Sequence, residues 1–352
     1  MVEAAATAPA VAAAVAGPPI LEVQDRQVHF PIHRGFLRRT VGHVKAVDGV
    51  SFSVLPGEAL GLVGESGCGK TTTGRAILRI YEPTGGTVRY RRADGRQVDV
   101  LSAGRDDLRE VRKDIRMIFQ DPHSSLNPRL PVSDIVGQPL KRHKIARGSA
   151  LNDRVEALLV RVGLRPEYMR RYPHAFSGGE RQRIGIARAL ALDPRFIICD
   201  EVVSALDVSV QAQILRLLRS LQSEFNLTYL FIGHDLAVIQ HICDRVAVMY
   251  AGRLVELGPV RAVFAAPKHP YTEALLSAVP RPDPRLRKSS ARIRLTGEVA
   301  NLANLPPGCP FHPRCRYATD RCRTEVPPLR KIAKGRDVSC HYAETLALAG
   351  VD

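Results

Sequence analysis

One glycine-rich stretch constrains the fold of this chain more than any other: Gly64-Glu65-Ser66-Gly67-Cys68-Gly69-Lys70-Thr71. It matches the pattern G-x-x-x-x-G-K-[ST]. A short apolar run at 59–63 precedes it, and a helical stretch at 72–80 follows. The glycines let successive backbone amides converge on phosphate oxygens, and the helix N-terminus adds partial positive charge. Because strand, loop and helix come in the order this chemistry needs, we expect a nucleotide site on a buried parallel strand of an α/β fold.

Within this loop, Lys70 is expected to reach the β- and γ-phosphates and Thr71 to hold Mg²⁺. A glycine turn that contains Lys-Thr by chance is the alternative, and the flanking strand and helix argue against it. The residues expected to contact ATP here are Gly64, Glu65, Ser66, Gly67, Cys68, Gly69, Lys70, Thr71 and Thr72.

The length and composition are those of a globular protein. The chain has 352 residues, which is room for two domains, with 45% hydrophobic and 24% charged residues. It contains no apolar run of about 18 residues that could span a bilayer. The net charge of +16 suits an anionic partner, such as a nucleotide, a nucleic acid or a membrane face, or else a solvated arginine-rich surface. Seven cysteines are too sparse and uneven for a disulfide scaffold.

The order of sequence patterns along the chain predicts a tail, a small sheet and two helices. Residues 1–19 are rich in Ala, Val and Pro and lack a basic residue, so we expect a disordered tail rather than a secretory signal. Strand-like stretches at 21–30, 44–55 and 88–100 predict a small antiparallel sheet beside the nucleotide site, with 34–42 as an exposed loop. Helices are expected at 133–143 and 152–163.

A second nucleotide motif lies at 196–201, where an apolar run ends in Asp200 and Glu201. Asp200 at a strand tip near the phosphate loop can hold Mg²⁺ through water, and Glu201 can accept a proton from an attacking water. An acidic turn after a strand is the alternative, which the upstream phosphate loop disfavours.

Between these motifs, Ser177 is placed to cap a helix, and Gly178 and Gly179 leave backbone amides uncovered at its start. This is a second helix N-terminus suited to binding phosphate. Since one nucleotide does not need two such helix ends, we expect this one to contact a nucleotide held by another subunit.

Ser177, Gly178, Gly179 and Glu180, followed by Arg-Gln-Arg, resemble the signature of ATP-binding cassette (ABC) ATPases. In order, Gln120 resembles the Q-loop, which reaches Mg²⁺, and His234 resembles the switch histidine. Phe30 resembles the aromatic residue that stacks on adenine, with Phe36 or His43 as less favoured substitutes. The residues that resemble the D-loop are Ser204, Ala205, Leu206 and Asp207. The resemblance implies a P-loop ABC ATPase with a RecA-like core, an antiparallel β subdomain and an α-helical signature subdomain.

Longer segments narrow the resemblance. The stretches 120–129, 204–213, 269–276 and 309–315 are similar to ATP-binding subunits of oligopeptide and dipeptide importers, an architecture that nickel importers share. This implies an ABC nucleotide-binding domain at 20–267 and an importer-type C-terminal extension at 268–352. Two residues depart from the usual pattern: Glu180 replaces Gln, and Val202 replaces the Pro after the catalytic Glu. We expect a small effect of the first and a looser turn from the second, with activity retained.

The resemblance implies a mechanism and partners. Two ATPase subunits bind ATP head to tail, with the Lys70 loop of one facing the Ser177 helix end of the other. Glu201 activates water, His234 stabilises the arrangement, and Gln120 couples the site to a groove that holds membrane subunits. The implied partners are a second ATP-binding subunit, expected to be a paralogue although an identical one stays open, two integral permease subunits and an extracytoplasmic solute-binding protein. The implied location is the cytoplasmic face of the membrane, and no nucleic acid is expected.

The last four cysteines, Cys309, Cys315, Cys322 and Cys340, run as C-x₅-C-x₆-C-x₁₇-C. That is not zinc-ribbon spacing, but four thiolates can hold Zn²⁺ or an iron–sulfur cluster. The resemblance to importers favours a [4Fe-4S] cluster, with zinc or unliganded structural thiols as alternatives. We expect this region to lie far from the phosphates and to act structurally.

A different functional class is a soluble ABC ATPase that acts on ribosomes or DNA, which the positive charge would suit. Such proteins usually carry two cassettes or a long coiled-coil insertion. This chain has one phosphate loop, no long heptad region and an importer-like tail, so import of peptides, or of nickel, is the favoured function.

Overall fold

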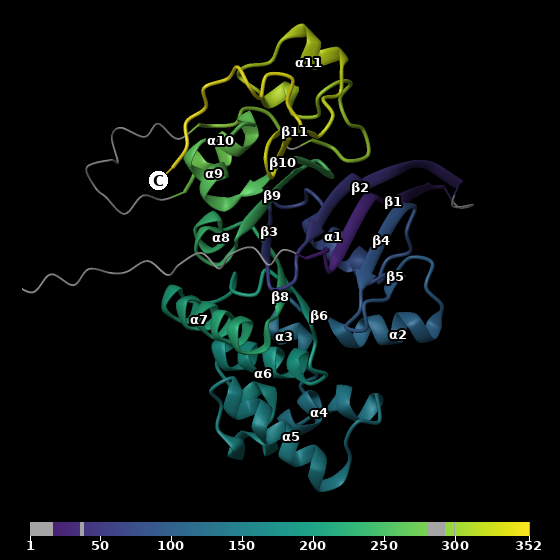
Figure 1. The fold of residues 1–352 in the computed structure, drawn as a ribbon, viewed down its shortest axis with the longest axis vertical. Coiled ribbons are helices and arrows are strands. Elements are labelled where there is room, and N and C mark those ends of the chain that lie inside the picture. The colour runs from purple at the N-terminus through teal and green to yellow at the C-terminus, as the bar shows by residue number, and fades with distance from the viewer. Residues whose placement is uncertain (1–16, 36–38, 280–292, 299, 352) are drawn as a thin grey trace, which may run out of the picture.

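The computed structural model describes residues 17–35, 39–279, 293–298 and 300–351, and an eight-stranded sheet forms its centre (Figure 1). The order in this sheet is β11-β12-β10-β9-β3-β8-β7-β6, and a second sheet has the order β2-β1-β4-β5. The strands are β1 Leu21–Arg34, β2 Arg39–Val54, β3 Ala59–Val63, β4 Gly85–Arg91, β5 Gln97–Asp99, β6 Ile115–Ile118, β7 Phe196–Asp200, β8 Thr228–Gly233, β9 Arg245–Tyr250, β10 Arg253–Pro259, β11 Arg330–Ala333 and β12 Arg336–Val338. The helices are α1 Lys70–Ile77, α2 Arg105–Asp114, α3 Pro122–Ser125, α4 Val132–Arg142, α5 Gly148–Arg161, α6 Gly178–Leu190, α7 Val208–Phe225, α8 Leu236–Ile242, α9 Val260–Ala265, α10 Pro270–Ser277 and α11 Asp320–Thr324.

The middle of the large sheet is parallel and buried on both faces. β3 pairs in parallel with β8 and β9, and β7 pairs in parallel with β6 and β8. Alternate residues of β3 enter different apolar clusters, Leu60 and Leu62 one and Ala59 and Val63 the other. Since parallel strands bring their carboxyl ends to one edge, this topology places the loop after β3 beside the carboxylates that end β7.

The small antiparallel sheet is present as predicted, but its first strand ends later and its second strand begins earlier than expected. Residues 39–42, expected in an exposed loop, begin strand β2 instead, because β1 and β2 continue as a long hairpin paired to Arg34 and Arg39. Their side chains are largely exposed, so they lack the buried apolar positions that identify a strand in sequence.

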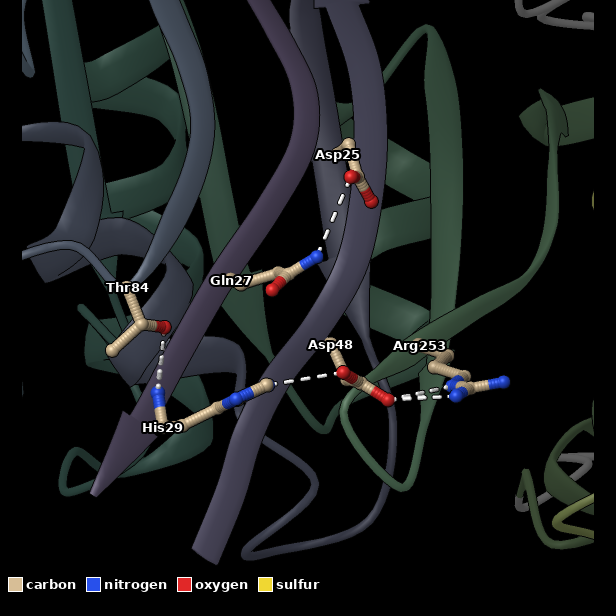
Figure 2. A network of polar contacts seen from close by, with 6 residues as sticks. All are labelled: Asp25, Gln27, His29, Asp48, Thr84 and Arg253. Carbon is tan, nitrogen blue, oxygen red and sulfur yellow. Dashed lines mark hydrogen bonds and ion pairs between the residues drawn. The ribbon is translucent and has the colours of Figure 1, made fainter. Parts of the chain in front are cut away.

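Asp48 ties this sheet to the core sheet (Figure 2). Its Oδ1 lies 3.0 Å from Nε2 of His29 on β1, and its Oδ2 accepts hydrogen bonds of 3.1 and 2.7 Å from Arg253 on β10. Burial alone would raise the pKa of Asp48, but the bonds and charge of Arg253 and the bond to His29 bring it below its usual value. The antiparallel sheet is therefore joined to the core by a polar contact as well as by apolar packing.

A helical subdomain of α3 to α6 lies at one end of the molecule, and the C-terminal extension lies at the other (Figure 1). Val136 of α4, Val155 and Leu159 of α5 and Ile184 of α6 are fully buried in one apolar cluster. The helices predicted at 133–143 and 152–163 correspond to α4 and α5. This subdomain presents the N-terminus of α6, which begins directly after Ser177.

The C-terminal extension adds strands to the core sheet. β12 pairs antiparallel with β10, and β11 pairs with β12. The join contains a buried ion pair in which Nη2 of Arg336 lies 2.6 Å from Oε1 of Glu256. Sheet pairing therefore crosses the expected division between residues 267 and 268.

The N-terminal tail and the lengths of the helices were also subjects of expectation. Most of the N-terminal tail that we expected to be disordered, residues 1–16, lies outside the described residues. Across the described ranges, no helix is both long enough and apolar enough to cross a bilayer.

Candidate nucleotide site

The phosphate loop leads from β3 into α1 and is closed by the side chain of Lys70. The Lys70 ammonium donates hydrogen bonds of 2.8 Å to the carbonyl oxygens of both Gly64 and Glu65. Gly69 caps α1 with a φ of +105°, and a Cβ there would collide with the carbonyl oxygen of Ala46. Glycine is required at this position on both counts, and the loop leaves amides at the start of α1 directed to a phosphate.

Thr71 and Asp200 meet at the edge of the sheet. The Thr71 hydroxyl donates a 2.9 Å hydrogen bond to Oδ1 of Asp200, a fully buried residue whose pKa burial raises above its usual value. Oδ2 of Asp200 is also buried and has no hydrogen-bond partner among the described residues. A hydroxyl and a carboxylate are hard oxygen ligands, and a buried carboxylate oxygen without a partner needs a cation or water, so the pair fits Mg²⁺.

Glu201 is the point where three distant motifs meet. Its Oε2 accepts a 2.7 Å hydrogen bond from Nε2 of Gln120, and its Oε1 lies 3.4 Å from Nδ1 of His234. Glu201 adopts a left-handed φ of +47°, and its own N–H donates to the carbonyl of Ile232 at 2.8 Å. Glu201 and His234 also line a cavity of about 80 Å³. The Q-loop glutamine, the acidic end of strand β7 and the switch histidine therefore lie together in space.

The turn after Glu201 tolerates Val202. The N–H and the hydroxyl of Ser204 both donate to the carbonyl of Glu201, at 3.1 and 3.0 Å. Val202 is 3% exposed and packs in the larger apolar cluster. Bonds from Ser204 and apolar burial therefore hold the turn that we expected the loss of proline to loosen.

The signature helix end is built differently from the phosphate loop. Ser177 is exposed, and its hydroxyl and N–H both donate to Oε2 of Glu180 at 2.9 Å. The Glu180 N–H donates back to the Ser177 hydroxyl at 3.3 Å, which completes a capping box. Gly179 lies so close to α7 that a Cβ there would be 2.5 Å from the Cγ1 of Val210.

The D-loop residues lie between the signature end and Glu201. Leu206 is half-buried, and its Cδ2 lies 3.3 Å from the position of a Cβ on Gly178. Ser204, Ala205 and Asp207 are exposed. The D-loop thus contacts the signature end through Leu206, while its polar residues are exposed.

The aromatic residue expected at adenine is on strand β1. Phe30 is half-buried and packs edge-to-face on Tyr81, with ring centroids 5.3 Å apart. Of its two less favoured substitutes, His43 is exposed on β2, and Phe36 lies outside the described residues.

The four C-terminal cysteines converge although they are up to 31 residues apart in sequence. Cys309, Cys315, Cys322 and Cys340 line one cavity of about 20 Å³ and are all free thiols. Burial raises the pKa of Cys309 and that of Cys315 to about 11. In the described part of the chain, however, no three His, Cys, Asp or Glu side chains are arranged as metal ligands.

The segment that carries these cysteines contacts the phosphate loop through a neighbouring side chain, which the sequence did not predict. Arg314, next to Cys315, donates to both carboxylate oxygens of Glu65 in the loop, at 2.7 and 3.0 Å. Tyr271 accepts a 2.8 Å hydrogen bond from the Glu65 N–H. Sequence reasoning missed both residues as neighbours of the nucleotide site; the only available signal was that each lies in an importer-like segment.

A phosphate loop with a buried aspartate at its threonine, and a glutamate between a glutamine and a histidine, define the class of P-loop ATPases with an ABC cassette. The sequence pattern of the "ABC transporter" family matches residues 47–204, and that of the "Oligopeptide/dipeptide transporter, C-terminal region" matches residues 255–322.

Characterised relatives match over nearly the whole chain. The chain is 52% identical to the oligopeptide transport ATP-binding protein AppF of Bacillus subtilis, over 92% of this chain and 97% of AppF. It is 50% identical to the oligopeptide transport ATP-binding protein OppF of Salmonella typhimurium, over 93% of this chain and 97% of OppF. Among solved structures, the ADP- and phosphate-bound dimer of the ATP-binding cassette MJ0796 has a TM-score of 0.58 and 25% identity, covering 68% of this chain and 99% of that one.

The chain belongs to the oligopeptide/dipeptide group of ABC transporter ATP-binding proteins. It is an ATPase that uses ATP and Mg²⁺ and has the ABC ATPase fold predicted from its sequence.

Proposed function

We propose that this chain hydrolyses ATP to energise import of dipeptides or oligopeptides across the cytoplasmic membrane, on whose cytoplasmic face it sits. The names of its relatives support the cargo, since they are transport proteins for oligopeptides and, at 46% identity in Pseudomonas aeruginosa, for di- and tripeptides. The match of residues 255–322 to the transporter's C-terminal region supports it independently.

One observation carries the catalytic part, namely the position of Glu201 between Gln120 and His234. Glu201 takes a proton from the attacking water, and Gln120 and His234 hold its carboxylate in place. Asp200 and Thr71 provide oxygen ligands for Mg²⁺, which would neutralise charge on the β- and γ-phosphates. Lys70 exchanges its bonds to loop carbonyls for bonds to the phosphates.

The exposed signature end supports a head-to-tail pair. Ser177 is exposed in this chain and Gly178 is half-buried, so the start of α6 is partly accessible to a second subunit. In the proposed assembly, this end closes over ATP held by the loop of a second ATP-binding subunit, a paralogue. Two integral permease subunits and an extracytoplasmic solute-binding protein complete the importer.

Reconstitution tests this function. We would assemble the chain in proteoliposomes with the permease and ATP-binding subunits that co-purify with it and measure phosphate release. Dipeptides and oligopeptides, delivered by the solute-binding protein, are expected to stimulate hydrolysis, and Ni²⁺ is not. Stimulation by Ni²⁺ alone would identify a nickel importer. Failure to co-purify with any membrane subunit, together with binding to ribosomes or DNA, would overturn the transport assignment.

We further propose that Cys309, Cys315, Cys322 and Cys340 hold a [4Fe-4S] cluster. Their convergence on one cavity supports this, and thiolate is the ligand that such clusters use. The thiols would have to lose their protons on loading, because burial keeps two of their pKa values near 11.

Anaerobic purification followed by iron and acid-labile sulfide analysis tests the cluster. The protein is expected to be brown and to bleach slowly in air. Cys315→Ser should remove the iron and lower the melting temperature, whereas Cys243→Ser, at a buried cysteine elsewhere, should keep the iron. Zinc without sulfide would correct the metal, and no metal with unchanged stability in Cys315→Ser would identify structural thiols.

A further inference from the structure

The phosphate loop is held at Glu65 by residues from outside the loop. Every polar group of Glu65 is engaged: the carboxylate by Arg314, the N–H by the hydroxyl oxygen of Tyr271, and the carbonyl by the ammonium of Lys70. Two of these partners come from the last third of the chain. The loop conformation therefore depends on contacts that the loop sequence does not contain.

The contact to Arg314 has the geometry of a strong ion pair. Two nitrogens of the guanidinium each donate to a different oxygen of the Glu65 carboxylate, at 2.7 and 3.0 Å. The Arg314 side chain is only 7% exposed, so solvent screens the pair less than a surface ion pair. Bidentate pairs of this kind fix direction as well as distance.

An aromatic cluster holds Arg314 and Tyr271 in position. The guanidinium carbon of Arg314 lies 5.9 Å from the ring centroid of Tyr250. The rings of Tyr250, Tyr271 and Phe311 pack on one another with centroids 4.7 to 5.4 Å apart. Tyr250 ends β9, Tyr271 lies in α10, and Phe311 lies three residues before Arg314. The core sheet and the extension thus form one platform behind the loop.

Glu65, which Arg314 holds, also positions the ammonium of Lys70 that is expected to bind phosphate. The Glu65 carbonyl that accepts from Lys70 belongs to the residue whose side chain Arg314 holds, and it also accepts from the N–H of Cys68 at 3.3 Å. A shift of Glu65 would therefore displace both the loop amides and the acceptor that positions the Lys70 ammonium.

We propose that Arg314 and Tyr271 are positioning residues for ATP binding, through which the C-terminal extension sets the nucleotide affinity of the phosphate loop. Neither residue needs to touch the nucleotide. They hold Glu65 so that the loop amides and Lys70 are already arranged when ATP arrives, which lowers the ordering cost of binding. The inference rests on the proposed role of this loop as the ATP site.

Titration of the full-length chain with a fluorescent ATP analogue tests this inference. Arg314→Gln is expected to raise the Kd about tenfold, within the range for loss of one coupled charge pair. The matched control is Arg330→Gln, which breaks another bidentate pair of the extension, with Glu344 at 2.8 and 2.7 Å, and should change the Kd less than about twofold. Equal affinities of Arg314→Gln and wild type would overturn the inference, whereas a wild type that binds no ATP would overturn the proposed function itself.

A double-mutant cycle separates positioning from general destabilisation. Glu65→Gln should raise the Kd by a similar factor. The variant with both changes should bind ATP little more weakly than either single variant, because both changes remove the same contact. Fully additive effects would contradict a direct contact between the two side chains.

Tyr271→Phe gives a milder test that should leave the fold intact, since it removes a single oxygen from a buried ring. It is expected to raise the KM for ATP about threefold in the assembled transporter, with kcat and melting temperature unchanged. A purely structural role would instead lower the active fraction, so that kcat falls while KM stays constant, and that result would count against the proposal.

Discussion

The phosphate loop and the signature end are both glycine-rich starts of helices, yet the chain treats them in opposite ways. The phosphate loop is supported by contacts from distant parts of the chain: Lys70 is 5% exposed, Asp200 of β7 contacts the start of its helix, and Tyr271 and Arg314 of the C-terminal extension contact the loop. At the signature end, by contrast, Ser177 is exposed, and among the described residues its hydroxyl bonds to Glu180 within the capping box.

In the proposed head-to-tail assembly, this difference separates the part of the nucleotide site that the chain builds itself from the part that a partner subunit would complete. A helix end that binds phosphate within its own chain can be surrounded by supporting contacts. One that must close over another subunit's nucleotide has to stay accessible, so its stability comes from local capping. The predictions below test this division, starting with the largest expected effect.

Glu201→Gln should nearly abolish hydrolysis while ATP still binds. The amide cannot accept the water's proton, so the rate should fall by roughly 10²- to 10⁴-fold, the usual contribution of a general base. Phosphate release measures the rate, and size-exclusion chromatography with ATP should show a trapped dimer. Glu156→Gln, at an exposed position of α5, is the control. Wild-type turnover would show that Glu201 is not the base, unless a competent site in the partner carries the rate.

Lys70→Ala should act on binding rather than on the chemical step. Loss of one charged hydrogen-bond donor to phosphate should weaken ATP binding by about 10- to 100-fold. Equilibrium titration checks this. An unchanged Kd would mean that the phosphates lie away from the Lys70 ammonium.

The isolated chain should be a poor ATPase whose specific activity rises with protein concentration or with the cognate partner subunit. The reason is that, in the proposed head-to-tail pair, each phosphate loop needs the signature end of a partner subunit to complete its site. Phosphate release per mole of chain, measured across a concentration series with light scattering to report mass, checks this. Rapid, concentration-independent hydrolysis by a proven monomer would rule out the sandwich.

Glu180→Gln should have the smallest effect, a change of about two- to threefold in ATP-dependent dimerisation. Gln keeps an oxygen that accepts from Ser177, so the capping box survives, while a negative charge is removed from a helix end that faces phosphate. We expect tighter ATP-dependent association and an unchanged melting temperature. Weaker association would show that the carboxylate, and not only its hydrogen bonds, supports this end.

Local patterns gave reliable predictions where the physics is local. The strand-loop-helix around Lys70, the acidic end of β7 and the helix cap at Ser177 each depend on residues within a few positions of one another. The antiparallel sheet was predicted with the facing ends of β1 and β2 misplaced, since exposed hairpin ends carry no apolar alternation. Helix α2 was not predicted, as its mostly charged sequence buries only Val111.

The sequence by itself determined the class of site, because glycines, a lysine and paired carboxylates at fixed spacing serve one chemistry. The ordered ABC-like motifs also predicted that Gln120 and Glu201 belong to one nucleotide site, although they lie 81 residues apart. Only the tertiary structure showed that Arg314 reaches Glu65 across 249 residues, since no pattern in the chain links these two. Such contacts follow from how the sheet orders its strands and where the extension packs, and these are properties of the whole fold.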